Sequence, residues 1–154
     1  MGEGLVNKVI LAYAAGIMDG EGCIHIRRRK KYNCFWPHIY DLQVVVSTTD
    51  GILADWFYER FGGHICKCKL RTTSNYPKYQ WCIQANQATG FLRKVLPYLL
   101  LKKQQAELAI KFQDKKKIRQ KHRFKNARPW IVYKYEDNTW MKLRQLKRIK
   151  LCVF

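Results

Sequence analysis

The sequence predicts an α+β fold in the order αββαββαα, with its four strands in one antiparallel sheet. Four short segments alternate apolar and polar side chains, which is the pattern of half-buried strands. The segments between them carry capping residues, glycine pairs or a proline at their ends, which indicates helices. Because 154 residues with 47% hydrophobic content can bury a sizeable core, we expect a folded domain over residues 1–117 and a basic extension over 118–154.

Local signals place the elements in the first half of the chain. Asn7 can cap the first helix, and the glycines from Gly20 onward end it. The run Ser47-Thr48-Thr49-Asp50 leads into the second helix, and Gly62-Gly63 closes it. We therefore expect a helix over 7–20, strands over 23–31 and 38–48, and a second helix that ends near 61.

The second half continues the pattern with two more strands, over 64–71 and 78–86. In the third strand we expect Cys66 and Cys68 in the core and Lys67 on the opposite face; in the fourth, Trp81 lies in the core. Pro97 stops the helix that follows. Helices are expected over 87–96, 104–117 and, in the extension, 139–150.

The charge of the chain indicates a polyanionic partner. It has 30 Lys and Arg against 11 Asp and Glu, a net charge of +19, and nucleic acid is the leading candidate for such an excess on a folded domain. The longest apolar run, 9–18, is too short to span a bilayer and acidic residues follow it, so we expect an intracellular protein that is neither secreted nor membrane-bound. The cysteines contain no Cys-x-x-Cys, which favours buried reduced thiols over a zinc site or disulfides.

One face of the four predicted strands carries basic and amide side chains. On any single strand this is the ordinary solvated face of an antiparallel sheet. Four strands that share the bias favour a sheet that binds double-stranded DNA, because Arg and Gln suit the guanine and adenine edges of the major groove. The expected DNA-binding residues are His25, Arg27, Arg29, Gln43, Lys67, Lys69, Arg71, Gln80 and Gln84.

The first helix carries small residues at four-residue spacing and ends in two acids. A tightly packed core helix would explain Ala12 and Gly16, but it leaves two carboxylates at a helix C-terminus, where the dipole disfavours negative charge. Two such helices paired along the small residues would bring their acidic ends together, where divalent cations would relieve the repulsion. The predicted dimer interface is Ala12, Ala15, Gly16 and Asp19.

The stretch Ala14-Ala-Gly-Ile-Met-Asp-Gly-Glu-Gly22 resembles the motif of the LAGLIDADG homing endonucleases. The resemblance extends to the αββαββαα order, to the helix end at Phe61-Gly-Gly63 and to the segment 97–106, whereas the tail from 118 resembles no family. It implies a homing-endonuclease-like fold in which the four-stranded sheet forms a saddle over DNA.

By position, the resemblance also implies the site residues. Glu21 would be the catalytic carboxylate that binds Mg²⁺ or another divalent cation, with the Gly20 carbonyl as a further ligand, and Asp19 would orient the helix end. Lys102, with Lys103 as the alternative, would contact the scissile phosphate or its waters. Thr48, or Ser47 beside it, stands where many relatives position water with Gln or Asn.

The activity implied by the resemblance is metal-dependent hydrolysis of both strands of a long, near-palindromic DNA target, for the homing of an intron that encodes the protein. Because the chain holds one motif and two strands must be cut, a homodimer is implied. Two alternatives stay open: a splicing factor that binds the host intron RNA, and a DNA-binding regulator that does not cleave.

Overall fold

The computed structural model describes residues 3–30, 32, 38–68, 77–121 and 130–149. Its elements are α1 (Glu3–Gly20), β1 (Gly22–Lys30), β2 (His38–Thr48), α2 (Gly51–Phe61), β3 (His64–Cys68), β4 (Lys78–Gln84), α3 (Ala85–Val95), the 3₁₀ turn η1 (Leu96–Tyr98), α4 (Lys103–Lys121) and α5 (Trp130–Ile149). This order confirms the predicted αββαββαα arrangement, to which α5 is added.

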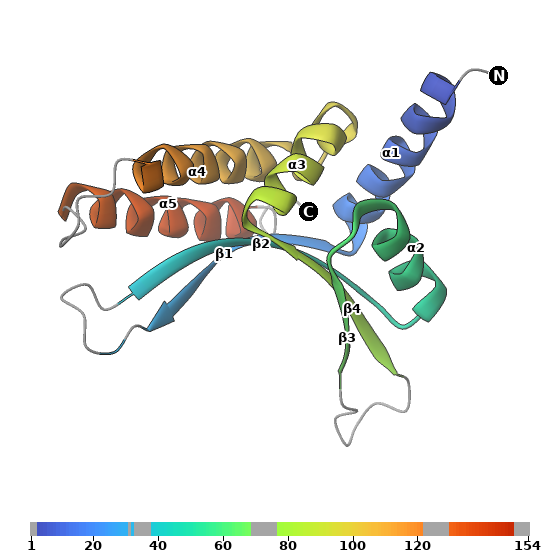
Figure 1. The fold of residues 1–154 in the computed structure, drawn as a ribbon, viewed down its shortest axis with the longest axis horizontal. Coiled ribbons are helices and arrows are strands. Elements are labelled where there is room, and N and C mark those ends of the chain that lie inside the picture. Colours follow the sequence, from blue (N-terminus) through green and yellow to red (C-terminus); the bar gives the residue numbers. More distant parts are fainter. Residues whose placement is uncertain (1–2, 31, 33–37, 69–76, 122–129, 150–154) are drawn as a thin grey trace.

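The four strands form one antiparallel sheet in the order β1-β2-β4-β3. The sheet bends into an arch, with β1 and β2 forming one arm and β3 and β4 the other (Figure 1). All the helices lie on the convex side of this arch, and the described part of the chain places no helix on the concave side (Figure 1). We call these two sides the covered face and the open face.

The core lies between the covered face and the helices. Strand alternation sends Ile24, Leu42 and Val44 toward the helices, where all three are fully buried. Trp81 is also fully buried, and its ring centroid lies 4.7 Å from that of Phe57 in α2. Its indole nitrogen donates a hydrogen bond of 2.7 Å to the Gly62 carbonyl, so a large apolar side chain is buried with its one polar group paired.

Capping residues bound α2 as the sequence predicts. The Asp50 side chain accepts a hydrogen bond from the Ile52 amide at 2.8 Å, the interaction expected of an N-cap aspartate. Gly62 ends the helix with a φ of 68°, and its amide donates to the Tyr58 carbonyl. Only glycine adopts this left-handed conformation at little cost, which explains the glycine at this position.

The C-terminal part of the chain differs from the prediction. The expected domain boundary at 117 falls inside α4, and α5 begins at Trp130 rather than near 139. α5 packs on the covered face: Leu143 is 2% exposed within the core, and the Tyr40 hydroxyl donates to Asp137. α5 is therefore part of the same core. α1 begins at Glu3 instead of Asn7, because no proline precedes Asn7 to prevent helical hydrogen bonding.

Arg28 shows how α5 meets the sheet. Strand alternation places Arg28 on the covered face, between two arginines that face the other way. Its guanidinium stacks on Trp140 of α5 at 4.8 Å from the ring centroid, a cation–π contact. The central residue of the Arg27-Arg28-Arg29 run thus joins β1 to α5.

None of the described helices is long and apolar enough to cross a membrane.

Candidate nucleic-acid interface and carboxylate site

Glu21 lies at the corner where α1 ends and β1 begins. Its amide donates to the Ile17 carbonyl at 2.8 Å, which closes the helix, and the side chain is exposed. The strand starts at the next residue, Gly22, where a Cβ would lie 2.6 Å from the Met18 sulfur. Only glycine fits so close to Met18. Gly22 therefore allows β1 to start directly at the end of α1, with Glu21 at the corner between them.

Asp19 is held by the chain segment that precedes α4. Its carboxylate accepts hydrogen bonds from three successive amides, those of Leu100 at 2.7 Å, Leu101 at 3.1 Å and Lys102 at 2.9 Å. These three amides precede Lys103, the first residue of α4, so Asp19 fixes the segment that leads into that helix. The end of α1 is thereby joined to the segment that precedes α4, and the expected role of Asp19 in orienting the helix end stays a prediction.

Lys102 completes this junction from the other side. Its ammonium donates to the Met18 carbonyl at 2.8 Å and to the Asp19 carbonyl at 2.5 Å. These carbonyls belong to the last turn of α1, where a cation is stabilising. Lys102 thus lies at the same helix end as Glu21 and holds the backbone from which Glu21 projects. Its predicted contact with the scissile phosphate stays a prediction.

The strand register defines the surroundings of Glu21 on the open face. Gly22, Val46 and Trp81 share a row across three strands. In the next row, Ser47 pairs with Gln80 and Gln80 with Cys66. Extending the β1–β2 pairing by one residue beyond Gly22 places Glu21 next to Ser47 in this row. Within it, Gln80 Nε2 donates to the Ser47 hydroxyl at 3.2 Å. Ser47 and Gln80 are therefore the polar strand residues in the row of Glu21.

Thr48 does not belong to this row, contrary to prediction. It faces the covered side, one residue out of step with Ser47. Its hydroxyl accepts a hydrogen bond from the Asp50 amide at 3.0 Å, so it shapes the turn into α2. The sequence analysis selected Gln80 for DNA binding only; its hydrogen bond with Ser47 on the neighbouring strand is what associates it with the row of Glu21.

A chain of hydrogen bonds crosses the middle of the open face. His25 Nε2 lies 2.9 Å from Gln43 Oε1, and the Gln43 amide nitrogen donates to the Cys82 sulfur. On the other side of the imidazole, the Cys23 sulfur lies 3.7 Å from His25 Nδ1 and 3.2 Å from the Lys147 ammonium. The hydrogen bond with His25 lowers the pKa of the Cys23 thiol to about 7, aided by Lys147 and opposed by burial.

Most of the predicted DNA-binding residues share the open face. The register brings together His25, Arg27, Arg29, Gln43, Gln80 and Gln84. Two residues that the sequence analysis did not select, His64 and Lys78, lie on the same face. Lys69 and Arg71 lie outside the described residues.

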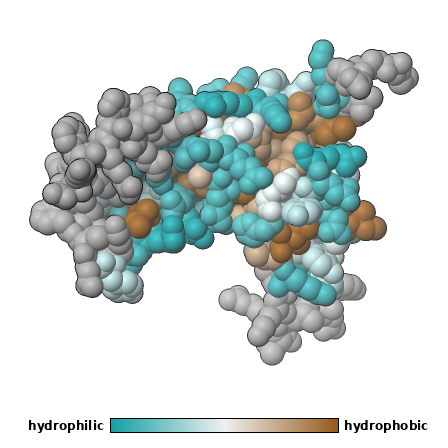
Figure 2. Space-filling view, viewed as in Figure 1, coloured by the Kyte–Doolittle hydropathy of each residue, from teal (hydrophilic) through white to brown (hydrophobic). Residues whose placement is uncertain are grey.

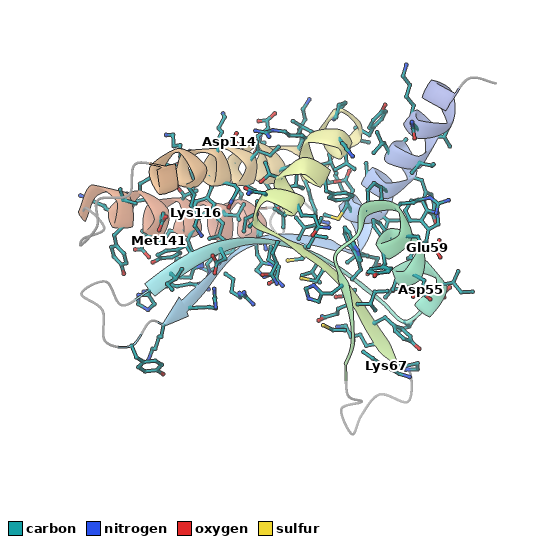
Figure 3. The ribbon with its side chains drawn as sticks, in the orientation of Figure 1. Asp55, Glu59, Lys67, Asp114, Lys116 and Met141 are labelled. Carbon is teal, nitrogen blue, oxygen red and sulfur yellow. The ribbon has the colours of Figure 1, made fainter. Side chains whose placement is uncertain are left out.

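The assignment of faces in β3 was wrong. Ile65 pairs with Trp81 and packs against the core, which puts Lys67 on the covered side, at the far end of the β3–β4 arm (Figure 3). There its ammonium lies 5.7 Å from the Tyr79 ring. Cys66, expected in the core, is exposed on the open face. The thiols of Cys23, Cys66 and Cys82 are free, and of these only Cys82 is buried.

α1 presents an apolar face that the described part of its own chain leaves uncovered. Val9 and Tyr13 are 62% and 54% exposed, and the exposed Ala12 and Gly16 lie beside them on the same side of the helix; Figure 2 shows apolar surface along this helix. A Cβ at Gly16 or Gly20 would meet nothing within 4 Å, so packing within the chain does not require glycine there. Ala15, predicted at the same interface, is instead fully buried.

Asp19 and Glu21 are the two carboxylates at the end of α1 that could bind a divalent cation. The described residues contain no group of three or more His, Cys, Asp or Glu side chains that could hold a metal ion. Because Asp19 is engaged by amides, Glu21 is the carboxylate that this corner can offer. Mg²⁺ is commonly bound by one or two carboxylates and completed by water and substrate phosphates, so Glu21 fits a cation shared with a bound phosphate. The Gly20 carbonyl as a ligand stays a prediction.

No family model and no curated protein sequence matches the chain. Solved structures do match its fold. A homing endonuclease, I-CvuI, in complex with its target matches with a TM-score of 0.74 and 19% identity over 92% of this chain and 84% of that one. The homing endonuclease I-TnaI matches with 0.63 and 16% over 90% and 93%. The LAGLIDADG homing endonuclease I-GzeII in complex with a DNA target matches with 0.62 and 17% over 87% and 43%. The chain therefore has the homing endonuclease fold.

Proposed function

We propose that this protein is a site-specific DNA endonuclease of the LAGLIDADG type. The observation that carries the proposal is the exposed Glu21 carboxylate, fixed between α1 and an open sheet face, in a chain with the homing endonuclease fold. The reaction is metal-dependent hydrolysis of phosphodiester bonds in both strands of a long, near-palindromic target. Such cleavage would serve the homing of an intron that encodes the protein.

The open face is the DNA-binding surface. Its arginines, histidines and glutamines supply donors and acceptors suited to base edges in the major groove. β1, with nine residues, spans about 30 Å, which corresponds to about nine base pairs at about 3.4 Å per pair. One copy of the chain therefore covers one half of a long site, and the bend of the sheet suits the curvature of a duplex (Figure 1).

The chain's own residues have distinct parts in the reaction. Glu21 binds the divalent cation, and Lys102 keeps the end of α1 in place while lying close enough to the corner to approach a phosphate. Ser47 and Gln80, in the row of Glu21, orient the attacking water. A bound Mg²⁺ would activate that water and stabilise the leaving oxygen.

A homodimer follows from the number of carboxylates. Each chain supplies one Glu21, and two strands must be cut. The match spans 93% of I-TnaI but only 43% of I-GzeII, so this chain has the size of a single unit. The occupant that fits the uncovered face of α1 is a second copy, because Gly16 and Gly20 are unobstructed and would let two helix backbones approach closely. Pairing there brings both Glu21 side chains near the centre of the target.

A Glu21→Gln variant tests the activity. Because the change removes the metal-binding charge and keeps the size of the side chain, we expect DNA cleavage to be lost while affinity for the selected site stays within several-fold. The measurement uses targets selected from a randomised DNA library in Mg²⁺. Glu59→Gln, at an exposed glutamate on α2 (Figure 3), is the matched control and should cleave normally. Cleavage by Glu21→Gln at the wild-type rate would refute the assignment, and a wild type that binds without cutting would indicate a regulator.

A Gly16→Leu variant tests the dimer. Leucine between two closely paired helices should abolish assembly through overpacking, whereas the isolated chain has open space at this position, so the variant should still fold as a monomer. Analytical ultracentrifugation with and without DNA is the measurement. Gly90→Leu, at a glycine of α3 whose Cβ position is equally open, is the control. A wild type that sediments as a monomer in both conditions would disprove the dimer.

RNA binding is the second candidate function, favoured by the basic helical layer. Exposed lysines and arginines of α4 and α5 lie on elements that form no part of the open face: Lys103, Lys111, Lys115, Lys134, Lys142 and Arg148. Such a surface could hold a folded intron RNA while the sheet is free. Filter binding with structured RNA distinguishes the two, since RNA held on the helices should not be displaced by target DNA.

A further inference from the structure

Asp41 is an acid on a face that is otherwise basic or neutral. Within the four strands, as far as they are described, it is the only aspartate or glutamate, and the register places it on the open face. A carboxylate on a surface that meets phosphates weakens binding through like-charge repulsion. Its presence there calls for a compensating role.

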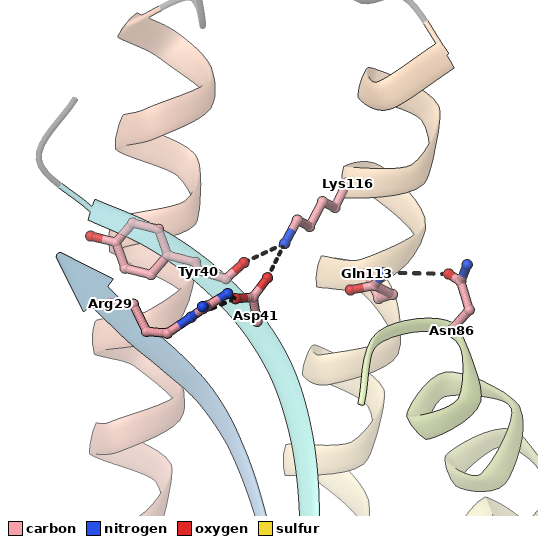
Figure 4. A network of polar contacts seen from close by, with 6 residues as sticks. All are labelled: Arg29, Tyr40, Asp41, Asn86, Gln113 and Lys116. Atoms are coloured by element: carbon pink, nitrogen blue, oxygen red, sulfur yellow. Dashed lines mark hydrogen bonds and ion pairs between the residues drawn. The ribbon is translucent and has the colours of Figure 1, made fainter. Parts of the chain in front are cut away.

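The contacts of Asp41 supply that role. One carboxylate oxygen accepts from both Nε and Nη2 of Arg29, the first at 3.1 Å, and the other accepts from the Lys116 ammonium at 2.8 Å (Figure 4). Lys116 comes from α4 and also donates to the Tyr40 carbonyl. Lys116 of α4 therefore anchors the Asp41 carboxylate, and this carboxylate in turn holds Arg29 of β1.

The three side chains differ in exposure. The side chain of Arg29 is 52% exposed, against 20% for Asp41 and 15% for Lys116. Because Nε and Nη2 of Arg29 face Asp41, the outer edge of the guanidinium, formed by Nη1 and the second proton of Nη2, is left for another acceptor. That edge has the two-donor geometry that matches O6 and N7 of guanine in the major groove.

We propose that Asp41 is a specificity-determining residue, which fixes the Arg29 guanidinium so that it reads one guanine in the outer part of each half-site. The inference rests on the proposed DNA binding. Lys116 neutralises the second carboxylate oxygen and anchors Asp41, so the arrangement exists before DNA arrives. A side chain held in its binding conformation loses less entropy on binding than a free one.

Arg27 provides a comparison on the same strand. It is the direct cross-strand partner of Asp41, yet the carboxylate binds Arg29 instead, and the buried Nε of Arg27 has no hydrogen-bond partner in the described part of the chain. Recognition by Arg27 should therefore be independent of Asp41. The effect of removing Asp41 should be confined to the base read by Arg29.

An Asp41→Asn variant tests the proposal, with Asp114→Asn as the matched control. Asp114 forms an ion pair of 2.7 Å with Arg93 in the helical layer, away from the open face (Figure 3). Both substitutions break an Arg–Asp pair and raise the net charge by one. Site selection from randomised DNA and affinity at two salt concentrations are measured for each, together with thermal melts.

For Asp41→Asn we expect tighter binding to unrelated DNA and about a five- to tenfold loss of preference at one outer base pair. Arg29→Ala should lose preference at the same base pair, and the double variant should lose no more there than Arg29→Ala alone. Asp114→Asn should leave the selection profile unchanged. Asparagine keeps the shape of the side chain, and the melts report any loss of folding.

Three results would overturn the proposal. The first is an Asp41→Asn profile equal to that of the wild type. The second is a uniform loss of preference at all positions with a lowered melting temperature, which would make Asp41 a structural residue. The third is a wild type that selects no sequence, which would refute the proposed function itself; a selective wild type combined with either earlier result refutes only the role of Asp41.

Discussion

Side chains on the covered face of the sheet are buried against helices, whereas those on the open face mainly contact one another. Trp81, for example, is fully buried among aromatic rings, while His25, Gln43 and Cys82 form a hydrogen-bonded chain on the other side of the same strands. Changes on the covered face should therefore cost folding stability, and changes on the open face should cost recognition. Substitutions at alternate positions of one strand can test this contrast.

Trp81→Ala should have the largest effect. Removing a fully buried indole costs about 3–5 kcal/mol of unfolding free energy, and it also leaves the Gly62 carbonyl without its hydrogen bond. Urea denaturation measures the change. A loss below about 0.5 kcal/mol, the size of ordinary surface changes, would mean that the two faces do not differ as described.

Arg27→Ala should show the opposite behaviour. We expect a loss of about 1–3 kcal/mol in discrimination at one base pair. The melting temperature should stay close to that of the wild type, because the buried Nε of Arg27 has no hydrogen-bond partner among the described residues. Site-selection profiles and melts are compared. A variant that melts far below the wild type and keeps its base preference would contradict the assignment of Arg27 to the open face.

Cys66→Ser should have the smallest effect and tests the face assignment in β3. Because Cys66 is exposed, the substitution should change the unfolding free energy by less than about 0.5 kcal/mol. Ile65→Ser, at the neighbouring position that packs against the core, should cost clearly more. If Cys66→Ser lowered the unfolding free energy more than Ile65→Ser, Cys66 rather than Ile65 would face the core.

Local signals in the sequence were sufficient for most of the fold. The bounds of β2, the cap at Asp50 and the helix end at Gly62 follow from residues within a few positions of one another. β3 was assigned to the wrong face because its alternation of cysteine and lysine suggested an apolar side at Cys66. Ile65, opposite Trp81, fixes the true parity, and that partner is known only once the strands are paired.

The site was less accessible to sequence reasoning. The family resemblance suggested Glu21 and Lys102 as site residues, but no local pattern connects Asp41 with Lys116 or Ser47 with Gln80. These pairs are 75 and 33 positions apart in the chain. Such contacts arise from strand register and helix packing, so the role of each polar residue became clear only from the folded arrangement.

The junction of Asp19 with the segment before α4 has a consequence for the order of folding. The Asp19 carboxylate and the Lys102 amide are 83 residues apart, and the intervening chain contains all four strands, α2 and α3. Contacts between such distant residues form late, because a large loop must close before they gain any energy. During synthesis, the helix end that bears Glu21 would lack its polar partners until residues 100–102 had left the ribosome. The proposed nuclease would thus acquire a fixed carboxylate only after all four of its DNA-binding strands had been made, which separates translation of these strands from the onset of any cutting.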